Sequence, residues 1–373
     1  MKFTVSKKVL YTTLQQVIKV TPVRSTLPIL SCVLFTAKEN DLEMRSTDLE
    51  ITVQTHCPIQ GEKDGSIAIP GRMLLEVSSE LPNSDLRFDV DLEKERITIS
   101  TMSGGEYVIV GRPANEFPSP PNVDNQGVFT FNKKVLQRII DKTAFAVTRD
   151  DMKISLSGVL FQFKENEFRA VATDGHRLVR YIRHDFPNND YINDILIPTK
   201  FLSLLSVNAK GDEDMELRIG KNHIMAVFTD MTLYSRLIDE RYPDYESVIP
   251  TNNKHIIKAD IDELLAAVKR ITIFSSKNTH QVQLKLSSSV LNLSTEDIET
   301  ASMANEDIPV KYDGEEFSIN LNGEYIKDIL RHIDGENIEI QMNSHMSASL
   351  FFPEIQEAGE DLLMLLMPIR SSN

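Results

Sequence analysis

The fold of this chain is decided by the stretch Ser157-Gly-Val-Leu-Phe-Gln-Phe-Lys-Glu-Asn-Glu-Phe-Arg-Ala-Val-Ala-Thr-Asp-Gly-His-Arg-Leu178. Its β-branched and aromatic residues predict two strands around a polar turn at 164–167. The segment 173–175 predicts a second bend, in which glycine is free to take a positive φ, and then the start of a third strand. Residues 31–50 share with this stretch the patterns Ser-x-Val-Leu-Phe, Lys-Glu-Asn and Thr-Asp, each 126 positions earlier (157 − 31). A period this long indicates a duplicated domain rather than a solenoid unit.

Two helix-starting patterns also recur along the chain. The first is a strand that leads into a helix, and its N-cap residues are Ser6, Asn132 and Asp260. The second is a strand followed by a helix at 67–74, 195–202 and, more loosely, 317–330. In the first two copies a proline stands near the first turn of the helix. The chain therefore predicts an α+β fold of three tandem similar domains, each with two helices and two small antiparallel sheets.

The boundaries of these domains follow from the repeats and from two proline-rich joints. The predicted domains are 1–122, 128–250 and 254–373, and the joints lie at 117–122 and 242–253. Stiff connectors of this kind favour a fixed angle between neighbouring domains.

The composition indicates a globular, cytoplasmic protein. The chain has 373 residues, of which 41 % are hydrophobic, and this is enough to bury several cores. Its two cysteines, Cys32 and Cys57, have no metal-like spacing and are expected to be reduced, buried thiols. The first eight residues lack the apolar core of a signal peptide, and the longest apolar run, near 362–369, is too short to cross a bilayer.

The charge is unevenly distributed along the chain. The net charge is −15, which argues against nucleic-acid binding for the chain as a whole. The predicted helices 6–20 and 132–147 are nevertheless basic, and helix 198–210 carries Lys200 and Lys210. A positive face for DNA explains this pattern, and ordinary solubilising charge is the alternative explanation. Arg72 and Lys200 favour the DNA face, because a cation in the first turn opposes the helix dipole unless a phosphate binds there.

The sequence contains none of the common catalytic motifs. The best candidate for catalysis is Asp174-Gly-His176, a carboxylate and an imidazole across a turn, which has no third member at a recognisable spacing. The alternative is a turn in which Asp174 caps backbone N–H groups. We therefore expect no enzyme activity, no metal and no cofactor.

Five motifs together resemble one family, the bacterial DNA sliding clamps (beta subunit of DNA polymerase III). They are Thr26-Leu-Pro-Ile-Leu30, Thr47-Asp-Leu-Glu50, Ala172-Thr-Asp-Gly-His-Arg-Leu178, Arg241-Tyr-Pro-Asp-Tyr245 and Met367-Pro-Ile-Arg370. The resemblance extends over residues 1–370. It implies a head-to-tail homodimeric ring of six similar domains, which encircles duplex DNA without reading its sequence and tethers the polymerase. Six domains that are each roughly 35 Å across leave a hole wide enough for a duplex.

The resemblance also implies three sets of site residues. The DNA-facing positions are Arg24, Arg72, Arg149 and Lys200. The partner groove, which takes short peptides of the Gln-x-x-Leu-Phe type, comprises Leu156, Thr173, Gly175, His176, Arg177, Leu178, Pro243, Val248, Met346, Ser347, Leu366, Met367, Pro368, Ile369 and Arg370. The dimer interface joins Tyr107 and Ile109 on one side to Ile273 and Phe274 on the other.

The implied partners are the DNA polymerase III catalytic subunit, the clamp loader and other DNA polymerases or repair proteins, with no membrane. The segment 366–369 also has the pattern of a buried C-terminal strand, and both interpretations can hold. The chain continues past the usual family end with Ser371-Ser-Asn373 at the rim of the expected groove. A monomeric scaffold, or an enzyme with an unrecognised site, is the alternative function.

Overall fold

The computed structural model of the chain describes residues 1–186, 190–209 and 211–370. It forms two compact units. The first unit consists of Met1–Asn132 and Asp212–Leu237, and the second unit consists of Lys133–Gly211 and the chain from Ile238 onward. Lys210 and Ser371–Asn373, which entered the sequence predictions, lie outside the described residues.

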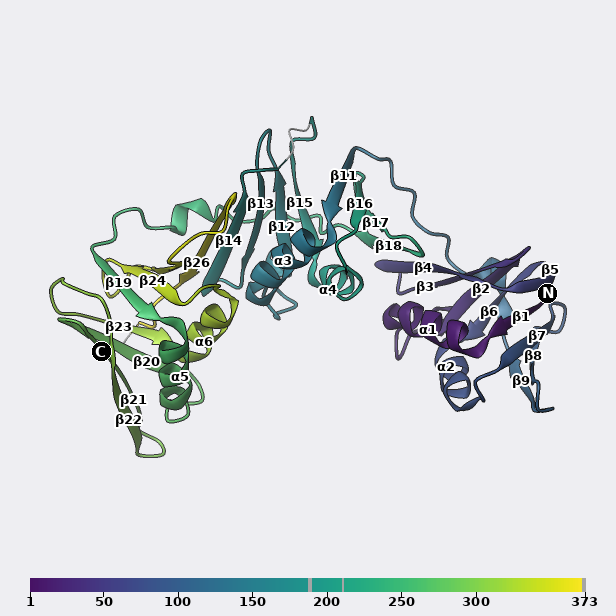
Figure 1. The fold of residues 1–373 in the computed structure, drawn as a ribbon, viewed down its shortest axis with the longest axis horizontal. Helices are drawn as coiled ribbons and strands as arrows, with labels where there is room; N and C mark the ends of the chain where they lie inside the picture. Colours follow the sequence, from purple (N-terminus) through teal and green to yellow (C-terminus); the bar gives the residue numbers. More distant parts are fainter. Residues whose placement is uncertain (187–189, 210, 371–373) are drawn as a thin grey trace. The chain divides into compact units, whose positions relative to one another are not determined.

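The first unit contains two antiparallel sheets (Figure 1). The smaller has the order β5 (Gln60–Lys63), β1 (Lys2–Ser6), β7 (Asp85–Asp91), β8 (Arg96–Thr101) and β9 (Glu106–Val110). The larger has nine strands in the order β10 (Arg112–Pro113), β6 (Gly65–Pro70), β2 (Cys32–Lys38), β3 (Asp41–Thr47), β4 (Ile51–Pro58), β18 (Met231–Arg236), β17 (His223–Val227), β16 (Asp214–Ile219) and β11 (Gly127–Asn132).

Helices α1 (Lys7–Val17) and α2 (Gly71–Glu80) lie side by side in the first unit (Figure 1). The apolar spacing of α1 places Leu10, Leu14 and Val17 in the core. Ser6 occupies the N-cap position, but its side chain makes no capping hydrogen bond.

The second unit also contains two antiparallel sheets. One has eight strands in the order β15 (Asn193–Pro198), β12 (Gly158–Phe163), β13 (Phe168–Thr173), β14 (Arg177–Arg183), β26 (Glu360–Leu366), β25 (Ser349–Pro353), β24 (Asn337–Met342) and β19 (His255–Asp260). The other has the order β22 (Ser302–Pro309), β21 (Val290–Asp297), β20 (Gln281–Ser287) and β23 (Phe317–Asn322).

The helices of the second unit pack in pairs, α3 (Lys133–Thr143) with α4 (Thr199–Asn208) and α5 (Ile261–Thr272) with α6 (Gly323–His332) (Figure 1). Asp260 caps α5 as predicted, because its carboxylate accepts the N–H of Glu263 over 2.8 Å. Short 3₁₀ helices complete the chain: η1 (Ile18–Val20), η2 (Pro28–Ser31), η3 (Ala114–Glu116), η4 (Ala144–Ala146), η5 (Ile154–Leu156) and η6 (Glu246–Val248). Within the described ranges, no helix has the length and apolarity needed to span a bilayer.

The predicted fold class is confirmed, and the duplicated stretch has the predicted form in both copies. Residues 158–183 form β12, β13 and β14, and residues 32–58 form β2, β3 and β4 in the same order. The small sheets of neighbouring repeats do not remain separate, however. Strand β4 pairs with β18, and β14 pairs with β26, so a sheet of one repeat continues into a sheet of the next. No sequence pattern indicated this edge-to-edge pairing.

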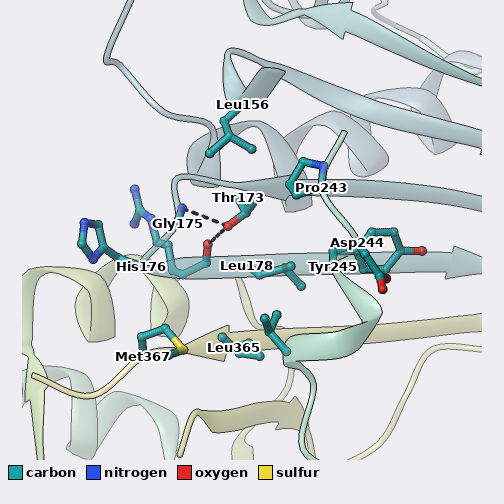
Figure 2. A pocket seen from close by; sticks show the side chains of 12 residues that line it. Leu156, Thr173, Gly175, His176, Leu178, Pro243, Asp244, Tyr245, Leu365 and Met367 are labelled. Atoms are coloured by element: carbon teal, nitrogen blue, oxygen red, sulfur yellow. Dashed lines mark hydrogen bonds between the residues drawn. The ribbon is translucent and has the colours of Figure 1, made fainter. Parts of the chain in front are cut away.

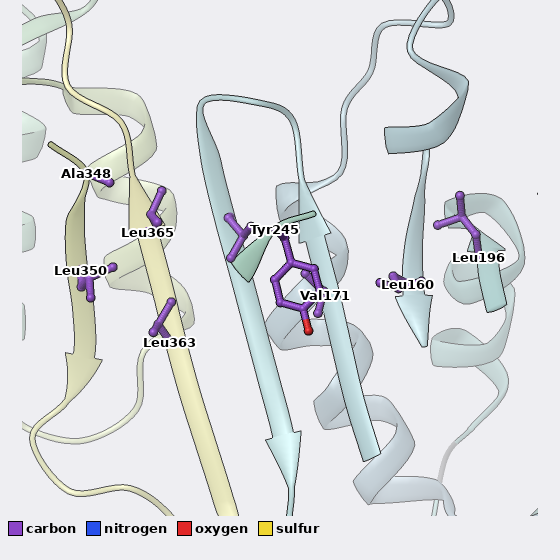
Figure 3. Packing of buried hydrophobic residues seen from close by; sticks show 9 residues of the cluster. Leu160, Val171, Leu196, Tyr245, Ala348, Leu350, Leu363 and Leu365 are labelled. Carbon is purple, nitrogen blue, oxygen red and sulfur yellow. The ribbon is translucent and has the colours of Figure 1, made fainter. Parts of the chain in front are cut away.

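One face of the eight-stranded sheet carries an apolar cluster to which both of its repeats contribute (Figure 3). Leu160, Val171 and Leu178 come from β12–β14, whereas Leu363 and Leu365 come from β26. Residues 237–254, which connect β18 to β19, are called the connector. The connector packs on this face through Ile238, Tyr242, Tyr245 and Ile249. The connector is therefore part of the core. Its position is set by this packing as well as by the stiffness of its prolines.

Candidate functional site

A cavity of about 320 Å³ opens in the second unit where strands β14 and β26 meet the connector (Figure 2). Its lining is mainly apolar and comes from segments that are far apart in the sequence. The lining residues are Leu156, Thr173, Gly175, His176, Arg177, Leu178, Pro243, Asp244, Tyr245, Val248, Leu365 and Met367.

The turn between β13 and β14 forms one wall of this cavity. The Thr173 hydroxyl accepts the N–H of Gly175 over 3.1 Å and donates to the carbonyl oxygen of Arg177 over 2.6 Å (Figure 2). The Asp174 carboxylate accepts the N–H groups of His176 (2.9 Å) and Arg177 (3.0 Å). Asp174 therefore acts as the cap of a turn, which was the alternative to its role as a catalytic carboxylate.

Strands β14 and β26 form the floor of the cavity. Leu178 lies directly opposite Leu365 in the antiparallel register, and both side chains belong to the apolar cluster. Just beyond the end of β26, Met367 donates its backbone N–H to the carbonyl oxygen of His176 over 2.8 Å. The floor thus depends on contact between the second and third repeats.

The connector forms the remaining wall with Pro243, Tyr245 and Val248. The Tyr245 hydroxyl donates to Oε1 of Gln162 over 2.6 Å, which fixes the buried ring on the sheet. Burial raises the pKa of Tyr245, and it raises the pKa of Tyr242 still further. Tyr245 lines the cavity and Tyr242 packs on the apolar cluster, and both phenols are neutral at physiological pH, as their ordinary pKa of 10 already ensures.

Nine of the fifteen residues predicted for the groove line this cavity. The other six do not: Met346, Ser347, Leu366, Pro368, Ile369 and Arg370. Leu366 faces away from the cavity, because successive residues of a strand point to opposite faces and Leu365 is the one that lines the cavity. The sequence prediction missed Leu365, Asp244 and Tyr245. Alternation along β26 and the motif Arg241-Tyr-Pro-Asp-Tyr245 carried the signals that could have identified them.

At the other end of β14 and β26 from the cavity, the second and third repeats are joined by a partly buried ionic cluster. Glu360 accepts hydrogen bonds from Arg138 (3.0 Å) and Arg183 (2.9 Å), and Asp334 pairs with Arg138 (2.7 Å) and Lys142 (2.6 Å). Burial alone would raise the pKa values of both carboxyls, but the hydrogen bonds from the cations outweigh it and leave both values below the usual range.

This cluster corrects part of the prediction that the basic helices form one positive face for DNA. The sequence suggested that the cations of helix α3 belong to one positive face. Arg138 and Lys142 instead pair with acids of the third repeat. These two charges stabilise the junction between the repeats.

The four predicted DNA-facing residues are all exposed. In the first unit, Arg24 lies in the segment after η1, and Arg72 is the second residue of α2. In the second unit, Arg149 follows η4, and Lys200 is the second residue of α4. The two cations in helical first turns thus have the position that the sequence predicted.

The four predicted interface residues differ in exposure. Tyr107 and Ile109 lie on β9, which forms an edge of its sheet. Tyr107 is partly exposed, whereas the side chain of Ile109 is only 4 % exposed and belongs to the core. Ile273 and Phe274 follow α5 and are 78 % and 43 % exposed.

Among the described residues, no group of three or more His, Cys, Asp or Glu side chains could hold a metal ion. Cys32 and Cys57 are free and buried, and burial raises the pKa of the Cys57 thiol to about 12. These thiols therefore pack in the core and are poor nucleophiles.

Three family models match consecutive parts of the chain. They describe the N-terminal, central and C-terminal domains of the DNA polymerase III beta subunit, and they match residues 1–122, 130–244 and 246–370.

The chain belongs to the DNA polymerase III beta subunit family.

Whole-length relatives agree with this membership. The beta sliding clamp of Escherichia coli is 30 % identical over 376 residues, which cover 99 % of this chain and 100 % of that one. The crystal structure of the DNA polymerase III subunit beta from Pseudomonas aeruginosa is 28 % identical and has a TM-score of 0.93, with 99 % of this chain and 100 % of that chain covered. A sliding clamp from the same organism, bound to griselimycin, matches with a TM-score of 0.93 at 28 % identity over 100 % of both chains. Membership in this family makes the chain a processivity factor of DNA replication and an accessory subunit, not a catalyst.

Proposed function

We propose that two copies of this cytoplasmic chain close head to tail into a ring around duplex DNA. Each copy contributes three clamp domains, at 1–122, 128–250 and 254–373. The edge strand β9 and the exposed pair Ile273 and Phe274 support a joint between unlike surfaces of two copies. A joint of this kind generates a closed ring when the rotation per copy completes a circle.

The proposed contacts to DNA are made by Arg24, Arg72, Arg149 and Lys200, and they bind phosphate without reading bases. Arg72 and Lys200 carry the main argument, since both stand in the first turn of a helix. A phosphate at that helix end is attracted both by the side chain and by the backbone N–H groups of the first turn. Such contacts are weak and screened by salt, which suits a ring that slides.

The proposed partner site is the cavity between β14, β26 and the connector. Its occupants are short linear motifs of the Gln-x-x-Leu-Phe type, carried by the polymerase catalytic subunit, the clamp loader, and other DNA polymerases or repair proteins. The single observation that carries this proposal is the apolar lining, to which two repeats and their connector contribute. Two buried apolar side chains at about 1.5–3 kcal/mol each, less the cost of ordering the peptide, suggest an affinity in the micromolar range.

A charge placed in the cavity tests this proposal. Val248 lines the cavity and is 48 % exposed, so Val248→Asp introduces a carboxylate into the site with little effect on folding. Ile256 is 46 % exposed and does not line the cavity, so Ile256→Asp is the matched control.

The measurement is a fluorescence anisotropy titration with a fluorescein-labelled Gln-x-x-Leu-Phe peptide, alongside a mass measurement of the assembly. We expect Val248→Asp to weaken binding at least about tenfold, and we expect Ile256→Asp to bind like the wild type. Equal binding by both variants would show that the peptide binds elsewhere.

A further inference from the structure

Arg177 lines the cavity, yet its guanidinium group is held by other parts of the second unit. Nε donates to Asp174 over 3.1 Å, Nη1 to Asp328 over 2.7 Å, and Nη2 to the carbonyl oxygen of Phe145 over 2.8 Å. The guanidinium carbon also lies 5.2 Å from the ring centroid of Phe145 and 4.6 Å from that of Tyr325. All three nitrogens therefore already donate to protein oxygens, and the side chain has a structural role.

The Arg177 side chain connects the cavity wall to the third repeat. Asp328 lies on α6 and does not line the cavity. Its carboxylate holds Arg177 through one oxygen and accepts a weaker hydrogen bond from Arg331 (3.3 Å) through the other. The ion pair between Arg177 and Asp328 thus links a helix outside the site to the turn that forms its wall.

The first copy of the duplicated stretch shows what the arginine adds. In the turn 47–51, Thr47 and Asp48 make the same backbone hydrogen bonds as Thr173 and Asp174. The residue that corresponds to Arg177 is Ile51 (177 − 126), which is buried and apolar. The turn therefore forms without an arginine, and the guanidinium contributes the additional link to α6.

We infer that Asp328 is a positioning residue of the peptide groove and acts through Arg177. It holds the arginine against α6, and the arginine in turn fixes the wall formed by Thr173, Gly175 and His176. This inference rests on the proposed function, because the occupant of the groove is the partner peptide. Without the carboxylate, the guanidinium keeps its bonds to Asp174 and Phe145 but loses its tie to α6, so the wall that the peptide contacts is held less rigidly.

Asp328→Asn tests the inference, and Asp334→Asn is its matched control. Asp334 also belongs to the third repeat and pairs with two cations of α3, Arg138 and Lys142, but not with Arg177. The peptide titration described above is repeated with both variants, and thermal unfolding checks that each remains folded. We expect Asp328→Asn to weaken peptide binding about tenfold, because the hydrogen bond to Arg177 loses its charged acceptor, whereas Asp334→Asn stays within about twofold of wild type.

Two further variants distinguish positioning from a general loosening of the junction. Asp328→Glu keeps the charge and should retain affinity within about threefold of wild type. In an Arg177→Lys background, Asp328→Asn should cause little additional loss of affinity, because a residue that acts through the arginine has nothing left to position.

The outcomes separate the inference from the proposed function. If wild type binds the peptide and Asp328→Asn binds equally well, the inference is wrong while the groove stands. Equal losses of affinity in Asp328→Asn and Asp334→Asn, or fully additive losses in the Arg177→Lys background, also overturn it. If wild type itself does not bind, the proposed groove fails and the inference fails with it.

Discussion

Leu49 and Gly175 occupy the same place in two copies of one turn, and both have a left-handed backbone, with φ of +78° and +92°. Glycine adopts this conformation without a steric penalty, whereas a leucine there is strained. The hydroxyls of Thr47 and Thr173 accept the N–H of Leu49 and Gly175 respectively, so each turn is held in the same way.

Substitutions at these two positions should have opposite effects on the stability of the protein. Leu49→Gly should stabilise the protein by a few tenths to about 1 kcal/mol, because it relieves the strained φ. Gly175→Ala should destabilise it by about 1–2 kcal/mol, and its cause is the backbone alone, since the nearest atom to an added Cβ is Nζ of Lys153 at 3.9 Å. Thermal unfolding measures both changes, and shifts of equal sign would contradict this explanation.

The C-terminal segment should be required for peptide binding but not for assembly. Removing residues 367–373 deletes the hydrogen bond from Met367 to His176 and one wall residue of the cavity. We expect peptide affinity to fall at least about tenfold, with the dimer unchanged in a native mass measurement. A shortened chain with full peptide affinity would exclude this segment from the groove.

The proposed ring joint should depend on the exposed apolar residues after α5. Replacing both Ile273 and Phe274 by alanine removes apolar contact worth several kcal/mol per joint, on the order of 2 kcal/mol for each side chain. The double variant should be a folded monomer by sedimentation at low micromolar concentration. Ile192→Ala removes a similarly exposed side chain from another site and should remain dimeric. A dimeric double variant would show that the joint lies elsewhere.

The proposed phosphate contacts should change how binding to DNA depends on salt. Changing Arg24, Arg72 and Lys200 to alanine should weaken binding to open, linear DNA about equally for any sequence. The slope of log K against log salt concentration should become shallower by about 0.9 for each phosphate that the variant no longer neutralises. The control changes three exposed lysines of the first repeat, Lys38, Lys63 and Lys94, and so removes the same charge. Equal slopes for the two triple variants would contradict the assignment.

The ionic cluster around Glu360 should make stability sensitive to acid. The pKa of Glu360 is lower in the folded chain than its ordinary value of 4.5, so its contribution is complete above that pH and is lost as the pH falls through the folded pKa. Glu360→Gln should therefore lower stability by about 1–3 kcal/mol at neutral pH and flatten the dependence between about pH 5 and pH 3. Glu62→Gln, at a more exposed pair with Arg87, should change little. Melting curves across this range decide between these outcomes.

The parts of the fold that repeat in sequence could be predicted, because local patterns determine them. Strand alternation, turn residues and the cap at Asp260 each act within a few residues. The repeat at an offset of 126 residues showed the strand and turn patterns a second time. The residues of the groove followed from the resemblance to a family. Neighbouring residues of a strand point to opposite faces, and in the structure Leu365, not the Leu366 that the resemblance implied, lines the cavity.

Contacts between distant segments could not be predicted from the sequence. Arg138 precedes Glu360 by 222 positions, and no local pattern distinguishes a cation that pairs with such a partner from one that faces DNA. The same holds for the ion pair between Arg177 and Asp328, whose members are 151 positions apart.

The pairing of β4 with β18 and of β14 with β26 has a consequence for any attempt to divide the molecule. A fragment cut at 128 and 250 would contain one whole repeat of the sequence and yet carry two bare sheet edges, β18 and β14. Bare edges recruit strands from other molecules, so such a fragment is prone to aggregate. One repeat of the sequence is therefore not a unit that can be isolated from the chain. Each repeat depends on its neighbours to cover the edges of its sheets.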